Sequence, residues 1–273
     1  MQFTQQPVQS LSGNIFVATF IFISLSFLSF GVLLLFADIT FINAEAIKWV
    51  FTSKETHHAL WMSLWTSTLT TMIALFFAIP MGYALSRYRF PGHIFVDTAV
   101  DLPIVFPPLV AGMTLLVFFS HTSIGRWIED MGLEFVLQPK GIVLCQFALS
   151  ASFAIRSAKV AFDDVDTRYE HVALTLGCSP WRSFFKVSLP LAKGGITAGA
   201  ILTWARAFGI FGPLMIFVGT FRGRTEVLST TIYLEQSVGR LENAMAISML
   251  LIIVAACVLI FMRRIGGRSS IGL

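Results

Sequence analysis

The sequence predicts an all-α integral membrane protein with about six transmembrane helices. The composition lies outside the range of soluble domains, because 56% of the 273 residues are hydrophobic, 12% are charged and the mean hydropathy is +0.78. Apolar runs of about 20 residues, the length that crosses the hydrocarbon core of a bilayer, recur along the chain. A polar segment, residues 166–190, interrupts them and is expected to be a folded unit of its own.

The six expected spans follow one another with short connections. They lie at about residues 15–36, 60–85, 94–119, 141–155, 194–218 and 244–262. The first is too long for a signal-peptide core and lacks a basic leader, so we expect it to be retained. The fourth is short for a full crossing unless its ends are shielded. Residues 15–265 would form one transmembrane domain between two tails, residues 1–14 and 266–273.

Prolines and glycines within the spans predict bends and close contacts. Pro103, Pro107 and Pro108 break backbone hydrogen bonds, which fits either a bend that lines a translocation pathway or a fixed kink needed for packing. Gly195 and Gly199 are four residues apart, the spacing of small residues at a close contact between membrane helices.

The distribution of basic residues predicts the orientation of the spans. With both termini in the cytoplasm, more of the 19 Lys and Arg residues fall in inner segments than in outer loops. Basic loops stay on the cytoplasmic side of a membrane. This topology places the polar segment between the fourth and fifth spans in the cytoplasm.

The first half of the polar segment carries the signals of a short helix. Asp166 or Thr167 can cap its N-terminus, and Thr167 and Glu170 have the spacing of a capping box. The helix is expected to run to Leu176. Gly177 follows it, and glycine is the residue best suited to the left-handed turn after a helix.

The second half predicts another short helix. Ser179 can cap its N-terminus, and Pro180 fits the first turn, where its missing N–H has no partner to lose. Pro190 is expected to close the segment. Two short helices joined by a tight turn would form a rigid projection that a partner protein can grip.

The sequence contains none of the common catalytic or nucleotide-binding motifs. There is no G-x-x-x-x-G-K-[ST] loop to cradle a phosphate, no H-E-x-x-H and no G-x-S-x-G. The three cysteines form no paired motif and the five histidines show no metal-ligand spacing. We therefore expect no catalytic residue, no metal site and no nucleic-acid partner.

The polar segment resembles the cytoplasmic EAA loop of binding-protein-dependent ABC importer permeases. In that pattern a Glu-Ala-Ala segment and a Gly are followed, after nine residues, by an aliphatic-x-Leu-Pro. Here nine residues separate Gly177 from residues 187–190, Val-Ser-Leu-Pro. The acidic end departs from the pattern, because His-Val-Ala stands at 171–173, so Glu170 is taken as the equivalent acid.

Two further stretches resemble the molybdate, tungstate and sulfate permease group of type I importers. They are residues 101–108, DLPIVFPP, and residues 205–212, ARAFGIFG. The resemblance implies import of a tetrahedral oxyanion, with molybdate or tungstate first and sulfate second. Phosphonate, other organic anions and ferric iron stay open, because selection lies largely with a separate binding protein.

The resemblance also implies an assembly in a bacterial or archaeal cytoplasmic (inner) membrane. Two copies of a separate ATPase would hold ATP and Mg²⁺, and this chain would bind no cofactor. A periplasmic or extracytoplasmic solute-binding protein would deliver the solute. A second permease copy would complete the pore within the lipid, as a homodimer or in a hetero-pair.

In such an importer the polar segment would transmit closure of the ATPase pair to the membrane path. The coupling loop would cover about residues 158–193, with Gly177 permitting the turn and Glu170 fixing the segment by a charge contact or by capping its own helix. The residues expected to couple to the ATPase are Glu170, His171, Val172, Ala173, Leu176, Gly177, Phe184, Leu189 and Pro190.

A second set of residues is expected along the translocation pathway. It comprises Asp101, Pro103, Pro107, Pro108, Arg206, Gly209, Ile210 and Gly212. The related permeases have Glu where this chain has Ile210, one helical turn after Arg206. Arg206 would therefore pair with Asp101 or Asp97, meet an anionic solute, or be satisfied by backbone carbonyls or water, because an unpaired charge within a membrane is costly.

Two other classes of protein compete with this interpretation. An ion-gradient-driven secondary transporter would show internal repeats and acids at the midplane, but the span acids Asp97 and Asp101 lie near one end of a span. An intramembrane enzyme would need a cluster of titratable groups for acid–base chemistry, and none is visible.

Overall fold

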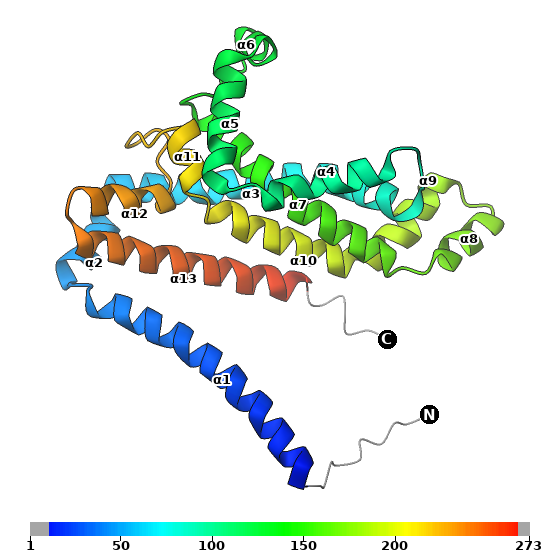
Figure 1. Ribbon diagram of the computed structural model, residues 1–273, viewed down its shortest axis with the longest axis horizontal. Helices are drawn as coiled ribbons and strands as arrows, with labels where there is room; N and C mark the ends of the chain where they lie inside the picture. The colour runs from blue at the N-terminus through cyan, green and yellow to red at the C-terminus, as the bar shows by residue number, and fades with distance from the viewer. Residues whose placement is uncertain (1–10, 267–273) are drawn as a thin grey trace.

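The computed structural model describes residues 11–266, and its regular elements there are helices. Long helices, several of them of membrane-spanning length, alternate along the sequence with short helices (Figure 1). The elements are α1 (Leu11–Thr40), α2 (Ala44–Thr52), α3 (Lys54–Arg87), α4 (His93–Val105), α5 (Pro108–His121), α6 (Ser123–Asp130), α7 (Pro139–Asp163), α8 (Thr167–Thr175), α9 (Pro180–Ser183), a π-helical turn (Phe184–Ser188), α10 (Leu189–Phe208), α11 (Gly212–Phe217), α12 (Leu228–Ser237) and α13 (Leu241–Gly266).

The core of the molecule lies where α3, α7 and α10 pack against one another. Small residues line these contacts, and a Cβ atom added to Gly195 or Gly199 on α10 would overlap Ala161 or Ser157 on α7. Only glycine lets the two backbones approach this closely, so the close contact expected from the spacing of the two glycines is confirmed.

The expected number of six spans is not confirmed and stays a prediction. Within residues 11–266, four helices are long and apolar enough to cross a membrane: α1, α3, α7 and α13. The third expected span is two helices, α4 and α5, which meet at an angle of 110° and would count as one further span. The fifth corresponds to α10, which carries Lys193, Arg206 and three glycines and is not among them.

The bend between α4 and α5 lies at the prolines. Phe106 and Pro107 separate the helices, and Pro108 opens α5, where its missing N–H costs no hydrogen bond. Pro103 instead lies inside α4. Beyond the bend, α5 and α6 stand away from the long axis of the bundle, as Figure 1 shows.

The fourth span is longer than expected. Its apolar run ends at about residue 155, but α7 continues to Asp163 and remains packed between α3 and α10. Buried small residues such as Ala158 and Ala161 continue the helix–helix contact after the apolar run ends. The polar residue Arg156 therefore lies within this helix rather than in a loop.

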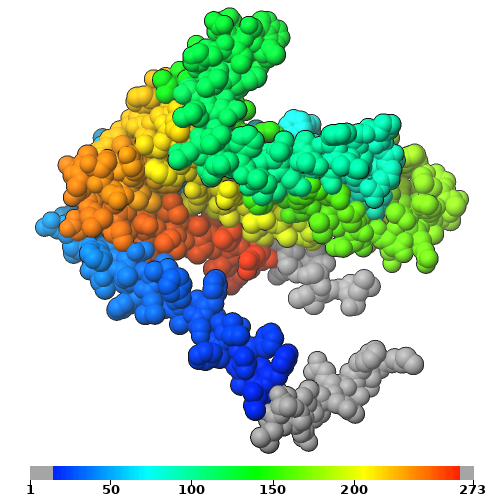
Figure 2. Space-filling model, in the orientation of Figure 1, coloured from blue at the N-terminus to red at the C-terminus, as the bar shows by residue number. Residues whose placement is uncertain are grey.

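The first helix lies apart from the rest of the molecule. The described side chains of α1 are almost all exposed, and Figure 2 shows it leaving the main body. Its apolar surface is available to lipid or to another chain. The helix begins at Leu11, so part of the expected N-terminal tail is helical; residues 1–10 and 267–273 of the two expected tails lie outside the described residues.

Candidate functional site

The first candidate site is the unit formed by α8, the turn after it and α9, residues 166–183, which we call the elbow. It lies at one end of the bundle, between α7 and α10 in the chain (Figure 1). Asp166 caps α8, because its carboxylate accepts a hydrogen bond of 2.9 Å from the backbone N–H of Arg168. The expected capping box between Thr167 and Glu170 is wrong, because Glu170 contacts α3 instead.

The turn after α8 has the geometry that its sequence predicts. Gly177 has φ of +85°, in the left-handed region. The N–H of Cys178 donates to the Ala173 carbonyl at 3.0 Å, and the N–H of Gly177 donates to the Leu174 carbonyl at 3.0 Å. These bonds satisfy carbonyls that the end of a helix leaves free.

The second helix starts as expected but does not end as expected. Ser179 accepts a hydrogen bond of 3.4 Å from the N–H of Arg182, and Pro180 occupies the first turn. Pro190 does not close the segment: α9, the π-helical turn and α10 follow without a break. In the π-helical turn the N–H of Leu189 bonds to Phe184, so the hydrogen-bond register has shifted just before the proline.

An ion pair ties the elbow to the end of α3. Nε of Arg87 donates to Oε1 of Glu170 at 2.8 Å, and the Tyr83 hydroxyl donates to Oε2 at 2.8 Å. The Arg87 and Glu170 side chains are only 9% and 11% exposed. A further bond from Nη2 of Arg87 to the Val165 carbonyl, also 2.8 Å, holds the start of α8. The expected charge contact of Glu170 is thus present, whereas helix capping by Glu170 is not.

The environment of Glu170 favours its charged form. Burial by itself would raise the pKa of this carboxyl, but the hydrogen bonds from Tyr83 and Arg87 outweigh burial and hold the pKa below its ordinary value. At neutral pH the elbow is therefore fixed by a fully ionised pair.

The expected coupling residues divide into exposed and inward-facing groups. Val172 and Leu176 are exposed to 57% and 80% and offer an apolar surface, and His171 and Pro190 are exposed as well. Ala173 is buried, Leu189 is half-buried, and Phe184 turns inward against the ring of Tyr83, at a centroid distance of 4.8 Å. Phe184 therefore supports the elbow from within instead of adding to its surface.

The sequence did not single out all the apolar side chains on this surface. Trp181 is 74% exposed and its ring stacks on that of Phe185, and Tyr169 and Leu174 are exposed on α8. The only sequence signal for these residues was an apolar residue one helical turn from a polar one. That spacing does not reveal which side of a helix is covered by the rest of the molecule.

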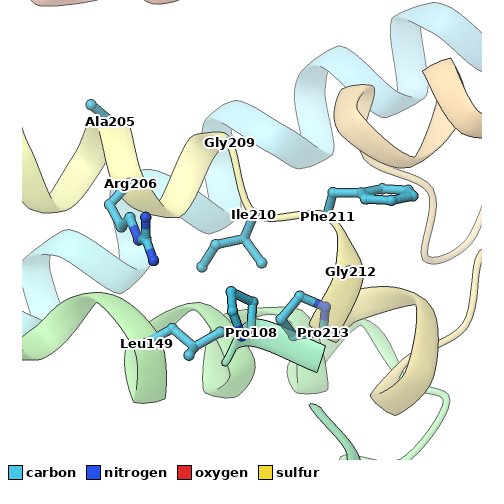
Figure 3. Close-up of a pocket in the computed structure, with 9 residues that line it drawn as sticks. All are labelled: Pro108, Leu149, Ala205, Arg206, Gly209, Ile210, Phe211, Gly212 and Pro213. Atoms are coloured by element: carbon cyan, nitrogen blue, oxygen red, sulfur yellow. The ribbon is translucent and has the colours of Figure 1, made fainter. Parts of the chain in front are cut away.

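The second candidate site is a cavity of about 400 Å³ at the break between α10 and α11. Figure 3 shows Arg206, Ile210, Pro108 and Leu149 converging on it, whereas Phe211 points away. The lining residues are Pro108, Leu149, Ala205, Arg206, Gly209, Ile210, Phe211, Gly212 and Pro213. Five expected pathway residues are thus brought together, but Asp101, Pro103 and Pro107 do not line this cavity.

Arg206 is an unpaired cation beside this cavity. Its guanidinium lies 5.5 Å from the centre of the Phe153 ring on α7, and in the part of the chain that the structure describes no carboxylate lies within ion-pair distance of it. The helix ends at Phe208, so Arg206 and residue 210 are not one turn apart on a continuous helix. Both side chains nevertheless line the cavity.

Of the alternatives left open for Arg206, the pair with Asp101 or Asp97 is wrong. Asp101 pairs with Arg156 of α7 through both carboxylate oxygens. Arg156 also bonds Asp97 at 2.6 Å. Arg156 was not among the expected residues, because the apolar run of the fourth span ends at residue 155 and this arginine follows it. The pair of Lys159 and Asp163, four residues apart, was a signal that the helix continues.

Comparison with known proteins identifies relatives of most of this chain. The sequence pattern of the family described as "Binding-protein-dependent transport system inner membrane component" matches residues 74–268. The molybdate/tungstate transport system permease protein WtpB of Thermococcus kodakarensis is 44% identical over 56% of this chain and 58% of its own length. The aligned region therefore covers somewhat less than two thirds of the length of that relative.

Two other comparisons extend further along the chain. The molybdenum transport system permease protein ModB of Mycobacterium tuberculosis is 34% identical over 82% of this chain and 83% of its own length. The crystal structure of a bacterial alginate ABC transporter in complex with a periplasmic protein has a chain that matches with a TM-score of 0.75, at 19% identity, over 96% of both chains. This chain belongs to the family of binding-protein-dependent transport system inner membrane components.

Proposed function

We propose that this chain is the permease subunit of an ATP-driven importer and forms the membrane path for a small oxyanion. The single observation that carries the proposal is the elbow, which projects at one end of the bundle and is fixed to α3 by the buried Arg87–Glu170 pair. A rigid projection with an exposed apolar surface suits a partner that transmits force. In this family the expected partner is an ATPase, with two copies serving two permease chains.

The elbow would transmit the motion of the ATPase through α3. Its exposed residues Val172 and Leu176 would lie in a cleft of the ATPase, in the cytoplasm. Because Glu170 holds Arg87 at the last residue of α3, a displacement of the elbow moves the end of that helix as well. ATP and Mg²⁺ would act in the partner, and this chain would contribute only the mechanical connection.

Arg206 is the group best placed to meet an anion on its way through the membrane. It is exposed beside the cavity of about 400 Å³ and has no carboxylate partner among the described residues. Pro108, Gly209 and Gly212 shape the walls, because helices end or begin at each of them. Asp101 is engaged by Arg156, which removes the acid that was expected to neutralise Arg206.

The relatives support molybdate or tungstate as the solute. Proteins named as permeases for molybdate, tungstate and molybdenum are 34–44% identical to the aligned parts of this chain. Sulfate is the second candidate, because it has the same tetrahedral shape and the same charge. A periplasmic solute-binding protein, as in the complex of the similar alginate transporter, would deliver the anion to the end of the molecule opposite the elbow.

Uptake into liposomes tests the proposal. The tagged chain, its ATPase and its binding protein are reconstituted, and uptake of labelled molybdate, tungstate and sulfate is measured with ATP inside. We expect uptake that needs ATP and the binding protein, and that falls at least about tenfold in Arg206→Gln, because a positive group in the path concentrates anions. Uptake driven by an ion gradient without the ATPase would show that the chain is a secondary transporter.

A further inference from the structure

A second charged cluster lies on α4 and α7, away from the cavity. Arg156 bonds both carboxylate oxygens of Asp101, the Asp97 carboxylate at 2.6 Å and the Asp97 carbonyl at 2.6 Å. The cluster contains two carboxylates and one guanidinium, so its net charge is −1 when all three are ionised. Neither the expected coupling surface nor the cavity at Arg206 uses Arg156.

The cluster and the cavity share one face of α7. Leu149 lines the cavity, Phe153 lies under the Arg206 guanidinium, and Arg156 follows three residues later. Residues three and four positions apart lie on the same side of a helix. With a rise of 1.5 Å per residue, Arg156 lies about 10 Å farther along α7 than Leu149, toward the elbow. Arg156 is therefore the first cation on this face of α7 between the cavity and the elbow.

The three side chains of the cluster are partly exposed. The Arg156, Asp97 and Asp101 side chains are 25%, 30% and 44% exposed, and Arg156 lies seven residues, about 10 Å, inside the end of α7. Within a membrane, charged groups face water or other protein, because contact with hydrocarbon is too costly. In a permease with the proposed function, the exposed side of the cluster would face the path or a second copy of the chain across it.

The cluster is also connected to the elbow. Arg87, which holds Glu170, is the last residue of α3, and a short turn leads from it to His93 at the start of α4. The imidazole Nε2 of His93 lies 3.1 Å from the Leu85 carbonyl, which fastens α4 to the end of α3. The helix that carries both aspartates is thus linked to the elbow through the end of α3.

We propose that Arg156, Asp97 and Asp101 form an anion gate that the elbow operates; this inference rests on the proposed function. In the structure the two aspartates cover Arg156, and the net negative cluster repels an anion coming from Arg206. When the elbow moves α4 away from α7, the guanidinium is uncovered and becomes the second cationic contact for the oxyanion. The path is thus closed to anions except while the ATPase moves the elbow.

Leakage of anions through the reconstituted transporter tests the gate. Liposomes that contain the complete transporter are loaded with labelled molybdate, and efflux is followed without ATP. The variant Asp97→Asn with Asp101→Asn is expected to raise molybdate efflux about tenfold, because an uncovered cation draws anions in, while K⁺ efflux stays unchanged. Adding Arg156→Gln to this variant is expected to return efflux to the wild-type level.

Controls separate the gate from general damage. Lys159→Gln removes a paired cation one turn farther along α7 and is expected to leave efflux unchanged. Arg156→Lys keeps the charge but lacks the planar fork that holds two carboxylates, so it should slow ATP-driven uptake without a leak. Co-elution with the ATPase shows that each variant is assembled.

The outcomes distinguish the gate from the proposed function. If the wild type imports no oxyanion, the proposed function fails and the gate fails with it. If the wild type imports normally but the double aspartate variant does not leak, or leaks equally after Arg156→Gln, only the gate is overturned.

Discussion

The tie between Arg87 and Glu170 makes a quantitative prediction about the elbow. The two side chains meet at 2.8 Å and are 9% and 11% exposed, so water screens their attraction very little. Removing one partner leaves the other buried and unpaired, which costs about 3–5 kcal/mol. Arg87→Met keeps most of the apolar stem and removes the charge, and we expect it to loosen α8 by that amount.

Amide hydrogen exchange of α8 measures this loss directly. A change of 3 kcal/mol or more corresponds to exchange that is about 100-fold faster or more, because each 1.4 kcal/mol is a factor of ten. The combination of Arg87→Met with Glu170→Gln should exchange more slowly than the two single effects predict together, because the double variant leaves no buried charge unpaired. Arg168→Gln is the control, since Arg168 is 90% exposed and its pair with Asp166 spans 3.9 Å.

Two results would refute this reasoning. One is exchange of the α8 amides that stays at the wild-type rate in Arg87→Met. The other is a double variant whose effect equals the sum of the single effects, because the two residues would then act independently.

Three further predictions concern the elbow and the loop between α11 and α12. In a thermal-unfolding assay, Gly177→Ala should destabilise the elbow by about 1–2 kcal/mol. The cause is the φ of +85° alone, since no atom lies within 4 Å of the added Cβ. Gly194→Ala, in equally open space within α10, should be neutral or slightly stabilising in the same assay. Because the pKa of Glu170 lies below its ordinary value of 4.5, protection of the α8 amides should hold from neutral pH down to about that value and fall below it, and Glu170→Gln should abolish this pH dependence. Glu226 is fully buried, its Oε1 has no partner among the described residues, and burial raises its pKa. Its contribution to the stability of the fold is therefore greatest below pH 4.5 and is lost as the pH rises through the raised pKa. Glu226→Gln should raise the melting temperature at neutral pH, and an unchanged melting temperature would contradict this reasoning.

The sequence was sufficient for the local features of the fold. The apolar runs located α1, α3 and α13, and the order of capping residues located α8, the Gly177 turn and the start of α9. These features depend on residues close together in the chain, where helix capping and the left-handed preference of glycine act. The close contact of α10 with α7 was also visible, because small residues four positions apart have few other uses.

Contacts between distant residues were beyond the sequence. Arg87 and Glu170 are 83 residues apart, and no local signal connects them. Pairing of Asp101 with Arg206 was one of several alternatives, and it assumed that depth in the membrane can be counted from the ends of apolar runs. That count fails where a helix bends, as at Pro107, and where it continues past its apolar run, as α7 does. Hydrophobicity reports which residues avoid water, but not which helix covers them.

Affinity purification of the tagged chain from its native membrane tests the central claim, that the elbow couples this chain to an ATPase. The wild type should retain a soluble ATPase in mild detergent. Val172→Glu with Leu176→Glu, which places charge on the exposed apolar surface and leaves the buried tie intact, should lose it. Recovery of the chain alone from wild-type membranes, with uptake still driven by an ion gradient, would contradict the account.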